Sequence, residues 1–212
     1  MIDVVAQVNA VRRQVGVRTL EAGEARVVTA TQVYDAPLED VWDACTTAER
    51  LARWFTPVTG DLTLHGRYEL QGNASGTVTA CDPPKAFDAT WEFGGEVSWI
   101  EVRLTPETPE RTRFTLDHIA HVDDERWAQF GPGAVGLGWD LSLMGLAMHL
   151  AAPSDVIDPA AIEAWSGSDE GRTFITLASQ DWRRASVAAG TPEAEAATAA
   201  QNTTDFYAPP AS

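Results

Sequence analysis

The sequence predicts an α+β protein in which a curved antiparallel sheet surrounds one long helix. Short β-branched and aromatic runs joined by short turns fill residues 58–119, and a glycine-led apolar stretch with helical spacing follows at 134–151. Short turns favour antiparallel hairpins, because parallel strands need long crossover connections. The chain of 212 residues is 44% hydrophobic, which is enough for one sizeable core with appendages.

The residues before the sheet predict a helix, a strand and two short helices. Valines at helical spacing favour a short amphipathic helix in the lead segment, and the β-branched run after it favours a strand. Pro37 suits a first helical position, and Thr46 with Glu49 fits a capping box. The elements expected here are a helix within 1–24, a strand at 26–34 and helices at 37–44 and 47–54.

Five β-runs form the predicted sheet, and their alternation assigns two faces. The runs are 66–71, 76–82, 86–93, 97–104 and 111–119. Successive side chains of a strand point to opposite faces, so residues two apart share one face. The inward positions of the two best-patterned runs are Phe87, Ala89, Trp91 and Phe93, and Phe114, Leu116, His118 and Ala120. One face is therefore apolar and must be covered.

The stretch at 134–151 predicts a long helix that is apolar on two sides. Its two stripes are Trp139, Leu143, Leu146 and Leu150, and Leu137, Leu141, Met144 and Met148. A helix of this kind is buried on two sides. One side is expected to face the sheet. The other needs cover either from residues 152–212 folding back or from a second copy, in which case the protein is a homodimer.

The last sixty residues predict a helical extension. A short helix begins at Asp158-Pro159, a longer one spans 169–189, and an alanine-rich one begins at Thr191-Pro192. Trp165 and Trp182 are expected to be packing anchors. By chain order we expect three parts: a helical lead segment (1–24), a principal domain (25–151) and a helical extension (152–212).

The charge balance excludes several classes of partner. The chain has 15 Lys and Arg against 31 Asp and Glu, a net charge of −16. Nucleic acids and anionic membranes bind basic surfaces, so neither is expected as a partner. No signal peptide is recognisable, and no stretch reaches the roughly 20 apolar residues of a membrane span. The cytoplasm is the expected location, with Cys45 and Cys81 as reduced thiols.

The motifs give little support to catalysis. Gly131 to Gly136 match G-x-G-x-x-G, but the upstream strands look antiparallel, so we expect close helix packing rather than dinucleotide binding. His121-x-Asp123-Asp124 is expected to be a helix start rather than a metal site. His65 and His149 have no partner recognisable in the sequence. We therefore predict no catalytic residue, no metal and no cofactor.

The aromatic residues favour an apolar ligand cavity, with a filled core as the alternative. His118 is either a core histidine, a polar anchor for a ligand or a general base. The residues expected to line the cavity are Trp54, Phe55, Tyr68, Phe87, Trp91, Leu116, His118, Trp127, Phe130, Trp139 and Leu143.

Four segments resemble a known family. They are VYDAPLEDVWDACTTAERLARWF (33–55), GRYEL (66–70), VTACDPPKAFDATWEF (78–93) and the tryptophan-containing helix near 139. The chain resembles the SRPBCC superfamily, with the helix-grip fold of START domains and plant pollen allergens. Within it, the chain looks like homologues of the heat-shock-90 ATPase activator C-terminal domain.

Three functions follow as hypotheses. The first is a non-enzymatic binding protein for a small hydrophobic or amphipathic molecule. The resemblance also implies a chaperone-interacting module that acts through its surface. Because helix-grip folds host enzyme sites, the third is a cyclase- or hydrolase-type enzyme that uses the same cavity.

Overall fold

The computed structural model describes residues 3–156 and 158–208. Contacts divide the chain into two compact units that do not follow chain order. Unit 1 is Met1–Ala30, His121–Leu141 and Asp158–Ser212, and unit 2 is Thr31–Ala120 and Ser142–Ile157. Each unit is described by itself below, and the three-part division by chain order remains a proposal.

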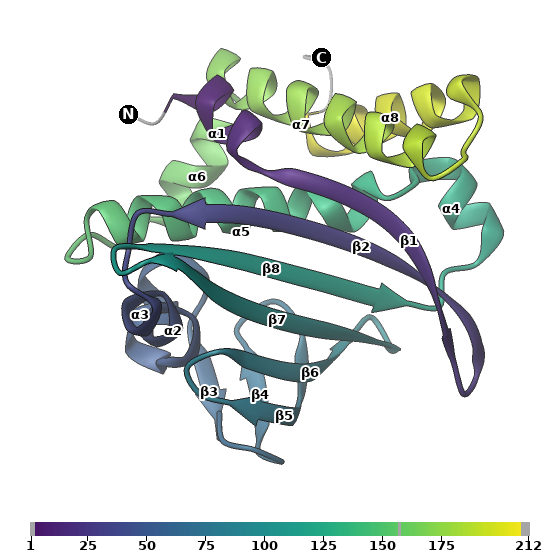
Figure 1. Cartoon of the computed structure of the whole chain (residues 1–212). Helices are drawn as coiled ribbons and strands as arrows, with labels where there is room; N and C mark the ends of the chain where they lie inside the picture. Colours follow the sequence, from purple (N-terminus) through teal and green to yellow (C-terminus); the bar gives the residue numbers. More distant parts are fainter. Residues whose placement is uncertain (1–2, 157, 209–212) are drawn as a thin grey trace. The chain divides into compact units, whose positions relative to one another are not determined.

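The strands form one antiparallel sheet in the order β1-β2-β8-β7-β6-β5-β4-β3 (Figure 1). Their bounds are β1 Arg12–Leu20, β2 Gly23–Tyr34, β3 Val58–Gly60, β4 Arg67–Leu70, β5 Ser75–Asp82, β6 Ala86–Phe93, β7 Glu96–Thr108 and β8 Arg111–Ala120. From β3 to β8 each strand pairs with the next along the chain. The α+β prediction, the strand at 26–34 and the five runs are thereby confirmed, whereas β3 was not predicted.

The helices also lie where the sequence predicts them, to within a few residues. Their bounds are α1 Val4–Ala10, α2 Leu38–Thr46, α3 Ala48–Trp54, α4 Asp124–Phe130, α5 Gly133–Ala151, α6 Pro159–Ser166, α7 Asp169–Ala188 and α8 Glu193–Tyr207. The predicted capping box is wrong. Thr47 is the N-cap of α3 and caps no backbone N–H with its side chain, while the Thr46 hydroxyl donates to the Trp42 carbonyl.

The lead segment is only partly helical. The helix ends at Ala10, and residues 12–20 form β1. The helical spacing of the valines, which continues to Val15, therefore predicts a helix correctly only as far as Ala10. A turn with Gly23 in the left-handed region (φ 118°) joins β1 to β2. The pairing of β1 with β2 decides the structure of this segment. The local spacing of its valines fits either a helix or a strand, as is common for short β-branched segments.

In unit 2, the register confirms the predicted faces. Phe87 lies opposite Val102, which in turn lies opposite Leu116. Ile100 of β7 likewise lies opposite Ala89 of β6 on one side and opposite His118 of β8 on the other. The second half of α5 packs on this face, because the Tyr34 hydroxyl from β2 donates to the Leu143 carbonyl at 3.1 Å. Unit 2 thus has one apolar face, and α5 covers part of it.

In unit 1, α7 and α8 approach the first half of α5 very closely. A Cβ atom at Gly136 would lie 2.3 Å from Cε2 of Trp182, and one at Gly133 would lie 2.9 Å from the Thr203 hydroxyl. The glycines therefore permit close packing, as expected, but their neighbours are the extension helices and not the sheet. The extension does fold back over α5, so a homodimer is not needed to cover this part of the helix.

A buried ion pair ties the lead segment of unit 1 to α5 and α7. The side chains of Arg13 and Asp140 are 2% and 0% exposed, and Arg13 Nη2 lies 3.0 Å from Asp140 Oδ1. Arg13 also donates to Asp181 at 2.8 Å, and the indole of Trp182 donates to Asp140 at 2.8 Å. Burial raises the pKa of Asp140 to about 6, against the opposing effect of Arg13 and Trp182.

Helix α5 is the one helix among the described residues that is long and apolar enough to cross a membrane by length and composition. The sequence prediction that no stretch reaches this length was therefore too strict. In unit 1 the helix buries Leu137 and Trp139, and in unit 2 it buries Leu143 and Leu146. Burial of this kind is typical of the core helix of a globular fold.

We expect Arg13→Met to lower the free energy of unfolding by about 3–5 kcal/mol at pH 7.5, because it leaves Asp140 buried without its cation. Urea denaturation measures the change. Arg12→Met is the matched control: Arg12 is the exposed neighbour on the same strand, and its loss should cost less than about 0.5 kcal/mol. Equal stability of the two variants would contradict a central role for the buried pair.

Candidate functional site

A row of four rings lies within unit 2. We call Trp54, Phe55, Trp91 and His118 the aromatic row. The ring centroids are 5.4 Å apart between Trp54 and Phe55, 6.5 Å between Phe55 and Trp91, and 6.4 Å between Trp91 and His118. Trp54 and Phe55 come from the end of α3, whereas Trp91 and His118 come from β6 and β8. The three larger rings are only half-buried.

His118 ends the row in a defined hydrogen-bond chain. Its Nε2 lies 2.9 Å from the Ser98 hydroxyl oxygen, and that hydroxyl donates to the Trp91 carbonyl at 3.0 Å. A carbonyl can only accept and a hydroxyl has one proton, so His118 Nε2–H must be the donor to Ser98. Burial lowers the pKa of His118 to about 4. The imidazole is therefore neutral at physiological pH.

The other predicted cavity residues of unit 2 lie on the same face of the sheet or on α5. Leu116 and Leu143 are buried. Phe87 is half-buried and packs edge-on against Trp42, with centroids 6.1 Å apart. Tyr68 is buried, and its hydroxyl donates to the Thr90 carbonyl at 2.6 Å. The predicted cavity residues did not include Ser98 or Trp42. Serine carries no signal by itself, and Trp42 entered the sequence analysis only within the segment 33–55 that carries the family resemblance.

Three predicted cavity residues belong to unit 1. Trp127 lies on α4, and the guanidinium of Arg26 stacks 5.1 Å from its ring centroid. Phe130 packs against Phe206 of α8, with centroids 6.0 Å apart. Trp139 is buried on the first half of α5. Within unit 2, the site therefore rests on the other eight residues.

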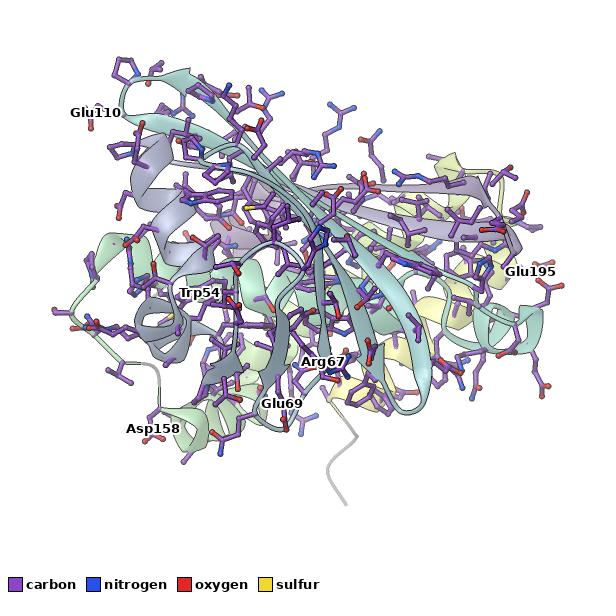
Figure 2. All side chains as sticks on the ribbon, turned by 90° about the horizontal axis from the view of Figure 1, so that it is seen from below. Trp54, Arg67, Glu69, Glu110, Asp158 and Glu195 are labelled. Carbon is purple, nitrogen blue, oxygen red and sulfur yellow. The ribbon has the colours of Figure 1, made fainter. Side chains whose placement is uncertain are left out.

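Apart from Glu96, the charged residues of strands β4 to β8 lie on the face opposite the aromatic row. Arg67 pairs with Glu92 at 2.8 Å, and Arg103 pairs with Asp88. Figure 2 shows Arg67 and Glu69 on β4, and these residues alternate with the inward Tyr68. The period of two along each strand thus separates charged from uncharged surface.

A hollow of about 660 Å³ lies at the end of the sheet formed by β3, β4, β5 and the tip of β6. Its lining includes Arg67, Glu69, Ser75 and Glu92. Tyr68 is the one predicted cavity residue that contributes to it. This hollow is polar and open, so it is not the oily cavity that the sequence predicts.

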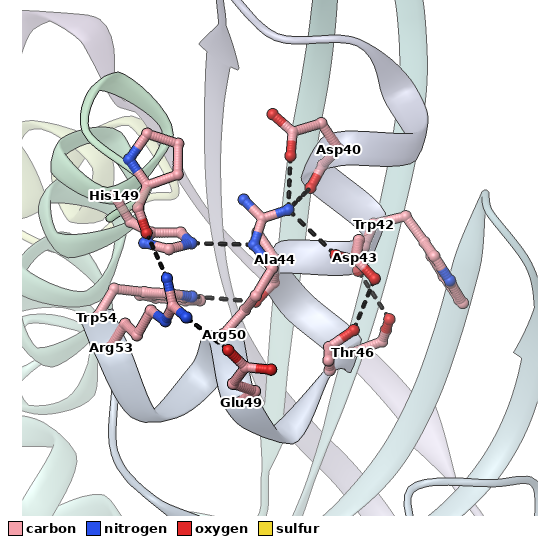
Figure 3. A network of polar contacts seen from close by, with 12 residues as sticks. Asp40, Trp42, Asp43, Ala44, Thr46, Glu49, Arg50, Arg53, Trp54 and His149 are labelled. Atoms are coloured by element: carbon pink, nitrogen blue, oxygen red, sulfur yellow. Dashed lines mark hydrogen bonds and ion pairs between the residues drawn. The ribbon is translucent and has the colours of Figure 1, made fainter. Parts of the chain in front are cut away.

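A polar network holds α3, and with it Trp54, against the end of α5 (Figure 3). Arg50 Nε donates to His149 Nε2 at 3.0 Å, and Arg50 Nη1 donates to the Asp40 carbonyl at 3.1 Å. Arg53 donates to the Pro153 carbonyl at 2.9 Å, and the Trp54 indole donates to the Ala44 carbonyl at 3.0 Å. The network fixes where the aromatic row begins.

His149 acts in this network as an uncharged acceptor. Burial lowers its pKa, and the nearby cations Arg50 and Arg53 lower it further. A partner for His149 thus exists, 99 residues away in the sequence.

The described residues contain no group of three or more His, Cys, Asp or Glu that could hold a metal ion. Asp123 is the side-chain cap of α4, accepting from the Arg126 N–H at 2.8 Å, as the helix-start interpretation expects. Cys45 and Cys81 are free thiols. Burial raises the pKa of Cys45 to about 12, which leaves it an unreactive thiol at neutral pH.

We expect acid to destabilise the fold through His118. Its pKa is lower in the fold than in the unfolded chain, so the fold binds fewer protons and loses stability as the pH falls from about 6.5 towards 4. From pH 7.5 to pH 5.0 the wild type should lose about 2 kcal/mol more than His118→Gln, whose amide does not titrate. Urea denaturation at both pH values measures this. Equal losses of stability in the wild type and in His118→Gln would show that the fold does not hold His118 neutral.

A matched pair of variants tests the acceptor role of His149. His149→Leu should cost about 1–3 kcal/mol, because the Arg50 Nε–H loses its acceptor in a buried place. His149→Gln should cost clearly less, since its Oε1 can occupy the position of Nε2. Thermal or urea unfolding compares the two. If both are equally stable, the hydrogen bond to Arg50 contributes nothing.

Comparison with known proteins places this geometry in a family. The family described as Activator of Hsp90 ATPase homolog 1-like protein matches residues 35–151, more than half of the chain. No curated protein matches the chain at a significant level.

Solved structures match over more of the chain. The crystal structure of CalU16 from Micromonospora echinospora is 34% identical and has a TM-score of 0.60, with 80% of this chain and 98% of CalU16 covered. The solution structure of the same protein is 31% identical with a TM-score of 0.67, covering 91% and 97%. MLL2253 from Mesorhizobium loti is 22% identical with a TM-score of 0.54, covering 62% and 100%, and supports the fold alone.

The CalU16 match extends well beyond residues 35–151, so parts of the lead segment or the extension are shared with that protein. The family match covers the chain from α2 to α5, a segment that contains the aromatic row and the Arg50 network apart from Pro153. The eight-stranded antiparallel sheet and the long helix after it agree with the helix-grip fold that the resemblance implied. The chain belongs to the Activator of Hsp90 ATPase homolog 1-like family of the SRPBCC superfamily.

Proposed function

We propose that unit 2 binds a small hydrophobic or amphipathic molecule against the aromatic row. The observation that carries this proposal is the partial exposure of Trp54, Phe55 and Trp91 in a continuous row. A tryptophan or phenylalanine that only fills a core is highly buried on average. Large rings that pack on one another and still reach solvent are typical of ligand sites.

The polar groups beside the row support binding better than catalysis. The Ser98 proton is donated to the Trp91 carbonyl and not to His118, so His118 does not activate Ser98 as a nucleophile. The low pKa of His118 makes it a weak base near neutral pH. The same two groups can orient a ligand through hydrogen bonds. We therefore favour simple ligand binding over a cyclase- or hydrolase-type activity.

The family description favours one further candidate. Its members are named for activation of the Hsp90 ATPase, so a chaperone-interacting module is the second proposal. Such a module acts through its surface and needs no ligand. Association with a chaperone and a raised ATPase rate, unchanged in aromatic-row variants, would favour it. Either role is compatible with the cytoplasmic location that we propose from the sequence.

We expect the wild type to bind a neutral apolar dye such as Nile red, and Phe55→Ala to weaken binding by about 10-fold, the loss expected for one stacking ring. Trp91→Phe should weaken it less, because an aromatic ring remains. Dye fluorescence measures both. Phe206→Ala is the control, since Phe206 is 70% exposed in unit 1. Absence of dye binding to the wild type, or equal loss in the control, would remove the proposal.

A further inference from the structure

The face of the sheet that carries the aromatic row is almost free of charge. Along β4 to β8, all of which are described, the Asp, Glu, Lys and Arg residues alternate onto the opposite face, apart from Glu96. Glu96 is exposed beside the β6–β7 turn. The groups that meet a ligand in the middle of the face are therefore aromatic, aliphatic or neutral and polar.

The one titratable group of the row also carries no charge. His118 is 6% exposed and donates through Nε2 to Ser98. Ser98 uses its single proton on the Trp91 carbonyl, and one of its two lone pairs receives His118 Nε2–H. The half-buried hydroxyl can accept one more hydrogen bond. The polar group at this end of the row is thus an acceptor for a ligand O–H or N–H.

The ring geometry suits a flat ligand better than a cation. Trp54 and Phe55 are tilted by 33° and Phe55 and Trp91 by 40°, so neighbouring rings of the row are tilted towards each other and not perpendicular. Recognition of a quaternary ammonium group typically uses an aromatic cage, in which several ring faces enclose the charge. A planar aromatic ligand, in contrast, gains offset or tilted stacking against any one of these three partly exposed rings.

We infer that the ligand of this site is an uncharged planar aromatic molecule with a hydroxyl or N–H group that donates to Ser98 Oγ. The inference rests on the proposed function of unit 2. A charged ligand would lose its hydration against the inner face of β4 to β8, which offers no counter-ion apart from Glu96 at its edge. The net charge of −16 repels an anion in addition.

Four naphthalene derivatives of nearly equal size test this inference at pH 7.5. They are 2-naphthol, 2-methoxynaphthalene, 2-naphthoate and naphthalen-2-ylmethylammonium. Isothermal titration calorimetry with the full chain should show 2-naphthol binding most tightly. The methoxy compound should bind about 5-fold more weakly because it lacks the donor. The anion and the cation should bind at least about 100-fold more weakly.

Ser98→Ala should reduce the affinity for 2-naphthol to that of 2-methoxynaphthalene and leave the latter unchanged. Thr115→Ala is the matched control, because Thr115 lies on β8 on the opposite face, beside the Thr31 hydroxyl. Binding of the anion or the cation as tightly as 2-naphthol would overturn the inference and leave the proposed function standing. So would a Ser98→Ala variant that still prefers 2-naphthol. If none of the four compounds binds, the proposed function itself fails.

Discussion

The antiparallel register of β6, β7 and β8 is the constraint on which the rest of unit 2 depends. Directly opposed residues share a face, so the pairing of Phe87 with Val102 and of Val102 with Leu116 makes one apolar surface from three strands. A shift by one residue would turn every side chain of a strand to the other face. The same pairing places the charged residues on the far side, where Arg103 meets Asp88.

Part of the aromatic row does not come from the sheet. Trp54 and Phe55 come from the end of α3. Their position depends on Arg50 and Arg53 of the same helix, which donate to His149 and to the Pro153 carbonyl at the end of α5. These guanidinium groups lie near the C-terminal end of a helix, where cations are favoured by the helix dipole. The positions of Trp91 and His118 thus depend on strand register, and those of Trp54 and Phe55 depend on the polar network.

Unit 1 is held together by a buried ion pair. Its buried Arg13 and Asp140 join a strand of the lead segment to α5, and Trp182 of α7 completes the hydrogen bonds. Gly136 makes room for the same tryptophan. A buried ion pair contributes little net stability compared with apolar packing, but it tolerates few alternative arrangements. The match with CalU16 beyond residues 35–151 is consistent with a framework larger than the family segment.

The sequence by itself determined the secondary structure of most elements and the face of each inward residue, because both depend on local periodicity. Alternation placed Trp91 and His118 on one face, and the glycine-led apolar pattern located α5. Only the tertiary structure decided that residues 12–20 form a strand, that Ser98 orients His118, and that His149 receives a hydrogen bond from Arg50. The partners in these contacts come from other elements, and Arg13 and Asp140 are 127 residues apart. No local pattern encodes contacts that exist only once the chain has folded.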